Sequence, residues 1–141
     1  MTVIGPRATL DNKGNTLFLA GAQIRRNSGI SIQNSVFIGW PIALLIDAGL
    51  GNPTDKNISD STIRFKNNTL AGNSVNVKYT ASASAPTGAT DAIILNWVSN
   101  PYYQNAITTN AVDAKLIQPF NYSLFDASPV SYTHLTLPTN R

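Results

Sequence analysis

The sequence contains no cysteine, no glutamate and a single histidine among its 141 residues. Without cysteine there is no disulfide framework, no thiolate-ligated zinc site and no cysteine nucleophile. Charged residues make up only 12% of the chain, about half of the usual share. Because surface helices ordinarily carry many Glu, Lys and Arg side chains, this deficit argues against helices as the main element. Asn, Thr, Ser, Gly, Ile and Val fill the gap, and these strand and turn residues favour an all-β fold.

Basic clusters and long hydrophobic runs are also scarce. The formal net charge is +3, and Arg25-Arg26 is the only adjacent basic pair, so we expect no nucleic-acid partner. No stretch approaches the roughly 18 apolar residues that a membrane-spanning helix requires. The first ten residues lack the basic segment and apolar run of a signal peptide. We expect a fragment of a larger protein; if that protein is exported, its targeting segment lies upstream.

A self-similarity at a spacing of 33 residues is the strongest internal pattern. Residues 30–39 align with residues 63–72, and the alignment continues without a gap, placing Ile42 on Val75. Each copy alternates apolar and polar residues, then has an asparagine, a short apolar segment, a glycine and a third segment. This order predicts three strands separated by two corners. A repeat of this length indicates a stacked, repetitive architecture.

We interpret the repeat as a right-handed parallel β-helix, a solenoid in which successive turns stack about 4.8 Å apart and like residues lie on like residues. Asn34 and Asn67 fall at one corner, where asparagine tolerates a left-handed backbone and where stacked amides can hydrogen-bond along the axis. Gly39 and Gly72 fall at the next corner, where a positive φ favours glycine. The segment 47–61 is then a loop between turns. The alternative is a β-sandwich whose strands resemble one another by chance.

The chain divides into three regions on this interpretation. Residues 1–80 hold the β-helix turns, of which the earliest spans 8–24. Residues 81–129 form a terminal turn and a cap, with a short helix near 91–98 that begins close to Asp91 and covers the open end of the stack. Residues 130–141 form a separate tail. Further short strands are expected at 16–19, 21–25, 105–107 and 114–117.

The C-terminal tail has a different origin in our interpretation. Residues 130–139, Val-Ser-Tyr-Thr-His-Leu-Thr-Leu-Pro-Thr, resemble one reading frame of a transposase-type sequencing adapter, residue for residue. A native terminal strand is the alternative. As an adapter-derived segment, the tail would carry the only histidine, His134. The remaining chain then has neither His nor Cys, which excludes nucleophilic triads and histidine-ligated metal sites.

The candidate binding residues are basic or aromatic, and none is assigned a catalytic or cofactor-binding role. Arg64 and Lys66 alternate outward from apolar positions and could line an outer face; the alternative is a solvated strand face whose charges prevent edge pairing. Trp40 follows a glycine corner, and Tyr102-Tyr103 follow a proline, so these rings could stack on sugars. The alternative for the rings is packing in the core or the cap.

Three aspartates surround the loop between the two copies of the repeat. Asp47, Asp55 and Asp60 could offer oxygen ligands to calcium, which prefers hard donors. Their spacing matches no compact calcium loop, and aspartates in such turns usually bond to their own backbone. We expect no cofactor, with calcium as the only candidate.

Residues 21–47, from Gly-Ala-Gln-Ile-Arg-Arg to Leu-Leu-Ile-Asp, resemble a segment of uncharacterised Bacteroidetes cell-surface proteins. Many of these are lipoproteins or are associated with type IX secretion. The resemblance extends loosely over residues 20–126. It implies a pectate-lyase-like β-helix and an extracellular or outer-membrane location, and it supplies no catalytic residues. The lipobox cysteine and the sorting domain of that group are not found here.

The leading functional hypothesis is a non-enzymatic surface protein that binds a polysaccharide or another surface partner through its outer face. The alternative is part of a polysaccharide lyase or hydrolase whose catalytic turns lie outside this chain. Such enzymes need clustered carboxylates, or a basic residue as general base, in a groove on the outer face. A third possibility is a spacer between other domains, which would show uniformly Ser, Thr and Asn on its outer faces.

Overall fold

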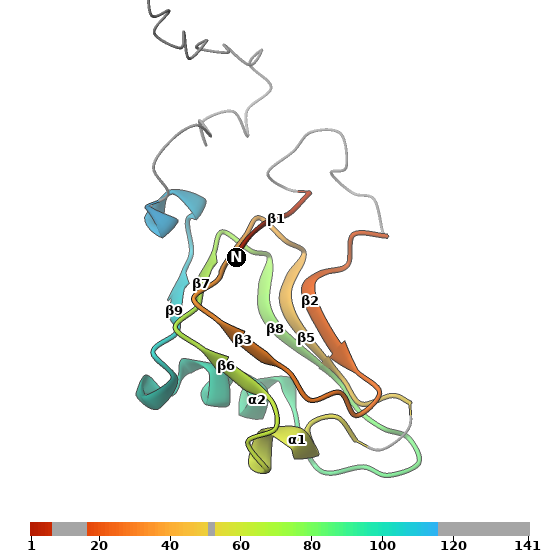
Figure 1. The fold of residues 1–141 in the computed structure, drawn as a ribbon. Helices are drawn as coiled ribbons and strands as arrows, with labels where there is room; N and C mark the ends of the chain where they lie inside the picture. The colour runs from red at the N-terminus through yellow and green to blue at the C-terminus, as the bar shows by residue number, and fades with distance from the viewer. Residues whose placement is uncertain (7–16, 51–52, 116–141) are drawn as a thin grey trace, which may run out of the picture.

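The computed structural model describes residues 1–6, 17–50 and 53–115. Their strands form three sheets (Figure 1). The first sheet contains, in spatial order, β1 (Thr2–Ile4), β4 (Val36–Ile38), β7 (Thr69–Ala71) and β9 (Ala106–Thr108). The second contains β2 (Ala20–Arg25), β5 (Ile42–Asp47) and β8 (Val75–Thr80), and the third contains β3 (Ser31–Gln33) and β6 (Arg64–Lys66). The helical elements are α1 (Lys56–Ser59), α2 (Asp91–Ser99) and the 3₁₀ turns η1 (Pro101–Tyr103) and η2 (Ala111–Ala114).

The expected all-β right-handed parallel β-helix is wrong. The described residues form three separate parallel sheets together with helices, an α/β-like arrangement with no closed or solenoid sheet. After β5 and after β8 the chain enters helical segments, and after β8 it forms no further strand of the third sheet. The low charge did not exclude helices, because the exposed positions of α2 carry Ile93, Leu95 and Asn96 in place of charged residues. The β-sandwich is also wrong, since every strand pair between described residues is parallel.

The alignment of the two copies of the repeat is confirmed by the strand register. In the third sheet Ile32 pairs with Phe65, and in the second Leu44 pairs with Val77. Ile42 lies opposite Val75, as the alignment predicts. Because like residues face one another at each level, apolar side chains from all three sheets meet in one core. This core includes the fully buried Phe37, Phe65, Leu44, Ile46 and Leu70.

The four expected corner residues all have a left-handed backbone. Asn34 and Asn67 have φ of 50° and 55°, and Gly39 and Gly72 have φ of 67° and 61°. A Cβ on Gly72 would also meet the Ala111 backbone nitrogen at 2.8 Å. Close approach as well as conformation therefore favours glycine at that position.

The expected stack of amides at Asn34 and Asn67 is wrong, because the residue after the corner makes the hydrogen bonds instead. The Asn68 Oδ1 accepts from the Ser35 N–H at 3.0 Å, and its Nδ2 donates to the Ile32 carbonyl at 3.0 Å. Asn105 repeats the arrangement one level further on, accepting from the Asn68 N–H at 3.0 Å. The left-handed residue only turns the chain; the side chain that follows it reaches the backbone groups left unpaired at the corner.

The short helix expected near 91–98 is confirmed, with α2 extending to Ser99. It begins at an N-cap, Thr90, whose Oγ1 accepts from the Ile93 N–H at 3.3 Å. Ile94 and Val98 are buried against the core, and Figure 1 shows α2 running below the strands. The Asp91 carboxylate lies at the edge of β8, where it accepts from the Tyr79 N–H at 2.7 Å and from the Lys78 Nζ at 2.8 Å.

Some of the remaining expected strands lie in the described residues, and others lie outside them. The strand expected at 21–25 is confirmed as β2, whereas residues 17–19 are not a strand. The strand expected at 105–107 is confirmed as β9, shifted by one residue. The strand expected at 114–117 is not found in its described part, because Ala114 ends the 3₁₀ turn η2. Most of the turn expected at 8–24, residues 116–117 and the tail at 130–141 lie outside the described residues.

Asp91 is expected to link stability to pH. Its hydrogen bond with Lys78 holds the pKa of its carboxyl below the ordinary value of 3.8, although burial opposes this shift. A carboxyl with a depressed folded pKa gives its full stabilisation above the unfolded pKa and loses it as pH falls through the folded pKa. Asp91→Asn should therefore lower the thermal unfolding midpoint at neutral pH, by an amount equivalent to about 0.5–1 kcal/mol for this half-exposed pair. The two proteins should converge once the pH falls below the depressed pKa of Asp91 in the folded state.

The matched control is Asp113→Asn, which removes the same charge from an exposed site. The Asp113 carboxylate has no side-chain partner among the described residues. Thermal unfolding followed by circular dichroism between pH 2 and pH 7 separates the two variants. An Asp91→Asn deficit of equal size at every pH would show that the carboxylate acts through shape and not through charge.

Candidate functional site

The outward side chains of β6 are both basic. Phe65 points inward and is fully buried, so the neighbouring Arg64 and Lys66 lie on the opposite face of the strand. Arg64 is exposed, and its Nε donates to the Ser61 carbonyl at 3.2 Å. Lys66 is half-buried. The sequence pattern therefore placed both cations on the correct face.

The turn η1 lies beside the end of β6. The Tyr103 carbonyl accepts from the Asn67 N–H at 2.8 Å, and the Asn105 Nδ2 donates to the Phe65 carbonyl at 2.8 Å. The turn is held by Asn100, whose Oδ1 accepts from the Tyr102 N–H at 2.9 Å. These bonds hold the turn that carries the two tyrosines at the end of the basic strand.

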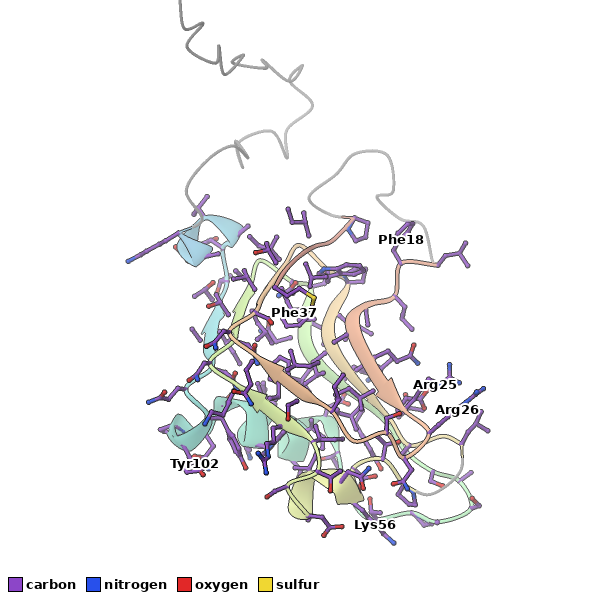
Figure 2. The ribbon with its side chains drawn as sticks, in the orientation of Figure 1. Phe18, Arg25, Arg26, Phe37, Lys56 and Tyr102 are labelled. Carbon is purple, nitrogen blue, oxygen red and sulfur yellow. The ribbon has the colours of Figure 1, made fainter. Side chains whose placement is uncertain are left out.

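The two tyrosine rings differ in exposure. Tyr102 is 78% exposed and Tyr103 is half-buried. Their rings pack edge to face with centroids 5.1 Å apart, and Tyr103 in turn packs against Trp97 at 5.7 Å. Figure 2 shows Tyr102 at the outside of the molecule, next to α2. Tyr102 is therefore an exposed ring that packs against Tyr103, and Tyr103 is held in turn by Trp97.

We call Arg64, Lys66, Tyr102 and Tyr103 the basic–aromatic surface. Aromatic faces bind the apolar faces of sugar rings, and cations bind carboxylate or sulfate groups. Sequence reasoning identified all four residues as binding candidates. It could not show that η1 lies beside the end of β6, because more than thirty residues separate the two pairs.

The fifth candidate, Trp40, lies elsewhere. It follows the Gly39 corner at the end of β4, whereas η1 adjoins the Asn67 corner, which precedes β7. Its indole Nε1 donates to the Val3 carbonyl at 3.2 Å, and its N–H donates to the Asn73 Oδ1 at 2.9 Å. Trp40 therefore packs at a corner, which is the alternative that the sequence left open.

The three loop aspartates are not brought together. Asp47 accepts from the Gly49 N–H at 2.9 Å and lies 3.7 Å from the Arg25 Nε. Asp60 follows the end of α1, and Asp55 precedes its start. Within the described ranges, no three acidic or histidine side chains form a group that could hold a metal ion. The calcium candidate therefore has no ligand cluster in this part of the chain.

Asp55 has a role that the sequence did not reveal. It is 7% exposed, and its carboxylate accepts from the Tyr79 hydroxyl at 3.1 Å and from the Thr87 hydroxyl. Burial raises the pKa of Tyr79 above its ordinary 10.0, a shift that Thr87 opposes and Asp55 strengthens. The three residues join the loop before α1, strand β8 and the segment before α2. No local sequence motif predicts such a contact.

A pocket of about 460 Å³ lies next to Asp55. It lies between α1, the segment 86–89 and α2. Its walls are mainly apolar, and one ionisable group, Asp55, is buried in them. The lining includes Asp55, Lys56, Ile58, Ile93 and Trp97.

Two further observations concern membranes and relatives. Among the described residues, no helix combines the length and the apolar character needed to cross a bilayer. No protein-family model, curated protein or solved structure matches the chain.

Proposed function

We propose that this protein is a non-enzymatic cell-surface protein that binds acidic polysaccharide through the basic–aromatic surface. The observation that carries the proposal is the hydrogen bond between the Asn67 N–H and the Tyr103 carbonyl, at 2.8 Å. It sets the turn that carries the two tyrosines beside the end of a strand whose outward residues are both cations. The cell-envelope location is supported by the resemblance of residues 21–47 to Bacteroidetes surface proteins.

The chemistry of the surface favours an acidic glycan over a neutral one. A sugar ring packed on Tyr102 would leave its carboxylate or sulfate groups near the guanidinium of Arg64 and the ammonium of Lys66. Charge attraction at an exposed surface is modest and is screened by salt. Stacking on the tyrosine therefore supplies most of the affinity, and the two cations supply the preference for an acidic chain.

Calorimetric titration with polygalacturonate, and with dextran as a neutral polymer, tests this proposal. We expect polygalacturonate alone to bind, and its affinity to fall as salt rises from about 20 to 200 mM. Tyr102→Ala should weaken binding about tenfold, equivalent to ~1.4 kcal/mol. Arg64→Gln should weaken binding about threefold, because one exposed ionic contact is lost.

Two matched variants control for exposure and charge. Val112→Ala truncates another exposed apolar side chain, and Lys56→Gln removes a cation that lies apart from Tyr102 (Figure 2). Both should bind like the parent. Equal binding of the two polymers, or equal losses in control and test variants, would contradict the proposal. Shortening of polygalacturonate during incubation would favour a lyase or hydrolase instead.

A further inference from the structure

The Asp55 carboxylate is buried without a cationic partner. The two ion pairs of the described residues are Arg25 with Asp47 and Lys78 with Asp91. Asp55 instead accepts two hydrogen bonds from neutral hydroxyl groups. Hydroxyl dipoles offset part of the cost of removing a carboxylate from water, and buried charges are usually balanced by an opposite charge.

The pocket offers room for such a charge next to the carboxylate. Asp55 lines a cavity of about 460 Å³, which exceeds the volume of a small organic molecule. Ile58, Ile93 and Trp97 line the same cavity. Indole is the aromatic group that attracts cations most strongly, and the aliphatic side chains suit methyl or methylene groups. A buried anion, an indole and aliphatic walls together match a cation that carries apolar substituents.

We propose that this pocket binds a small organic cation, a substituted ammonium ion. Its charge lies against Asp55, and its apolar groups lie against Ile93 and Trp97. Inorganic cations fit less well, because they require several oxygen ligands and the described residues offer no acidic group of three. The proposal is independent of the basic–aromatic surface, since none of the four residues of that surface lines the pocket.

Lys56 provides an internal check on the proposal. It is exposed and lines the same pocket, but it forms no ion pair with Asp55 within 4.0 Å. The positive charge of Lys56 would repel a bound ammonium ion. Lys56→Gln should therefore tighten the binding of the cation by about two- to fivefold, whereas a ligand held by its negative charge would bind more weakly.

The probes are choline and its neutral isostere 3,3-dimethylbutan-1-ol, each titrated calorimetrically into the full chain. We expect choline to bind at least about tenfold more tightly than the alcohol, because the two differ only in the charge that Asp55 and Trp97 recognise. Asp55→Asn should weaken choline binding at least about tenfold while leaving the alcohol unaffected. Asp60→Asn, which removes an exposed carboxylate at the other end of α1, should change neither affinity.

A second variant keeps the test valid if Asp55→Asn fails to fold. Ile93 is 53% exposed on α2, so Ile93→Arg should fold normally while placing a cation and added bulk at the pocket. This variant should abolish choline binding, with its fold checked by circular dichroism. Equal affinity for the two probes would overturn the proposal. Absence of choline binding at about 20 mM, which would occupy most of a site of millimolar affinity, would overturn it too.

Discussion

Truncation of Phe65 to alanine is expected to lower the free energy of unfolding by about 3–5 kcal/mol. The ring is fully buried at the middle of β6. It contacts Phe37 at a centroid distance of 5.7 Å and Trp97 at 6.5 Å. It therefore joins the repeated strands to helix α2. Removing it costs the transfer energy of the ring and leaves a cavity that rigid neighbours on both sides cannot fill.

Urea unfolding followed by circular dichroism measures this loss. Because natural domains are stable by only about 5–15 kcal/mol, the alanine variant is expected to unfold at much lower urea concentration. Phe65→Leu is the matched control, since it keeps most of the volume and should cost less than about half as much. A loss below about 1 kcal/mol for alanine would mean that the core collapses around the cavity or that the ring is not buried.

The repeat made the strand register predictable, because apolar residues must pair level by level whenever a pattern recurs at a fixed spacing. Ile42 opposite Val75 follows directly from the sequence. The corner residues are also local features: Asn67 and Gly72 are the types that tolerate a positive φ. The start of α2 was visible in Asp91, which lies in its first turn.

The fold class was not predictable in the same way. A two-copy repeat shows which residues pair, but it does not show that the chain enters helices between strands, because those segments fall outside the repeated pattern. The hydrogen-bonding amide was predicted one residue too early, at Asn67 instead of Asn68, for a related reason. Asn67 and Asn68 are chemically identical, and the first copy has Asn34 followed by serine. The pattern therefore pointed to the corner residue and concealed the buried one.

The candidate sites were likewise predictable only where a local rule applies. The outward direction of Arg64 and Lys66 follows from strand alternation, which is a local rule. The position of η1 beside the end of β6 depends on how the chain returns after α2, and no local rule contains that information. The contact of Asp55 with Tyr79 joins residues 24 apart, in segments that do not resemble each other. Polar residue types alone do not indicate which of them become partners in a folded chain.

Asn68→Ala is expected to lower the free energy of unfolding by about 2–4 kcal/mol, although it removes only an amide group. Asn68 is 1% exposed. Its side chain satisfies the Ser35 N–H and the Ile32 carbonyl, both at 3.0 Å. Alanine would leave these two groups without a side-chain partner at a buried corner. Each such unpaired group costs roughly 1–3 kcal/mol, more than the net value of the bond itself.

Asn67→Gly separates the role of the amide from the role of the corner. Asn67 has φ of 55°, and glycine adopts such a conformation freely, so this substitution should change the unfolding free energy by less than about 0.5 kcal/mol. Urea unfolding of both variants makes the comparison. If Asn67→Gly proved as costly as Asn68→Ala, the corner amide would carry the stacking bonds after all. The opposite ranking is expected, because a left-handed residue redirects the chain, and it is the next side chain that lies over the unpaired backbone of the preceding level.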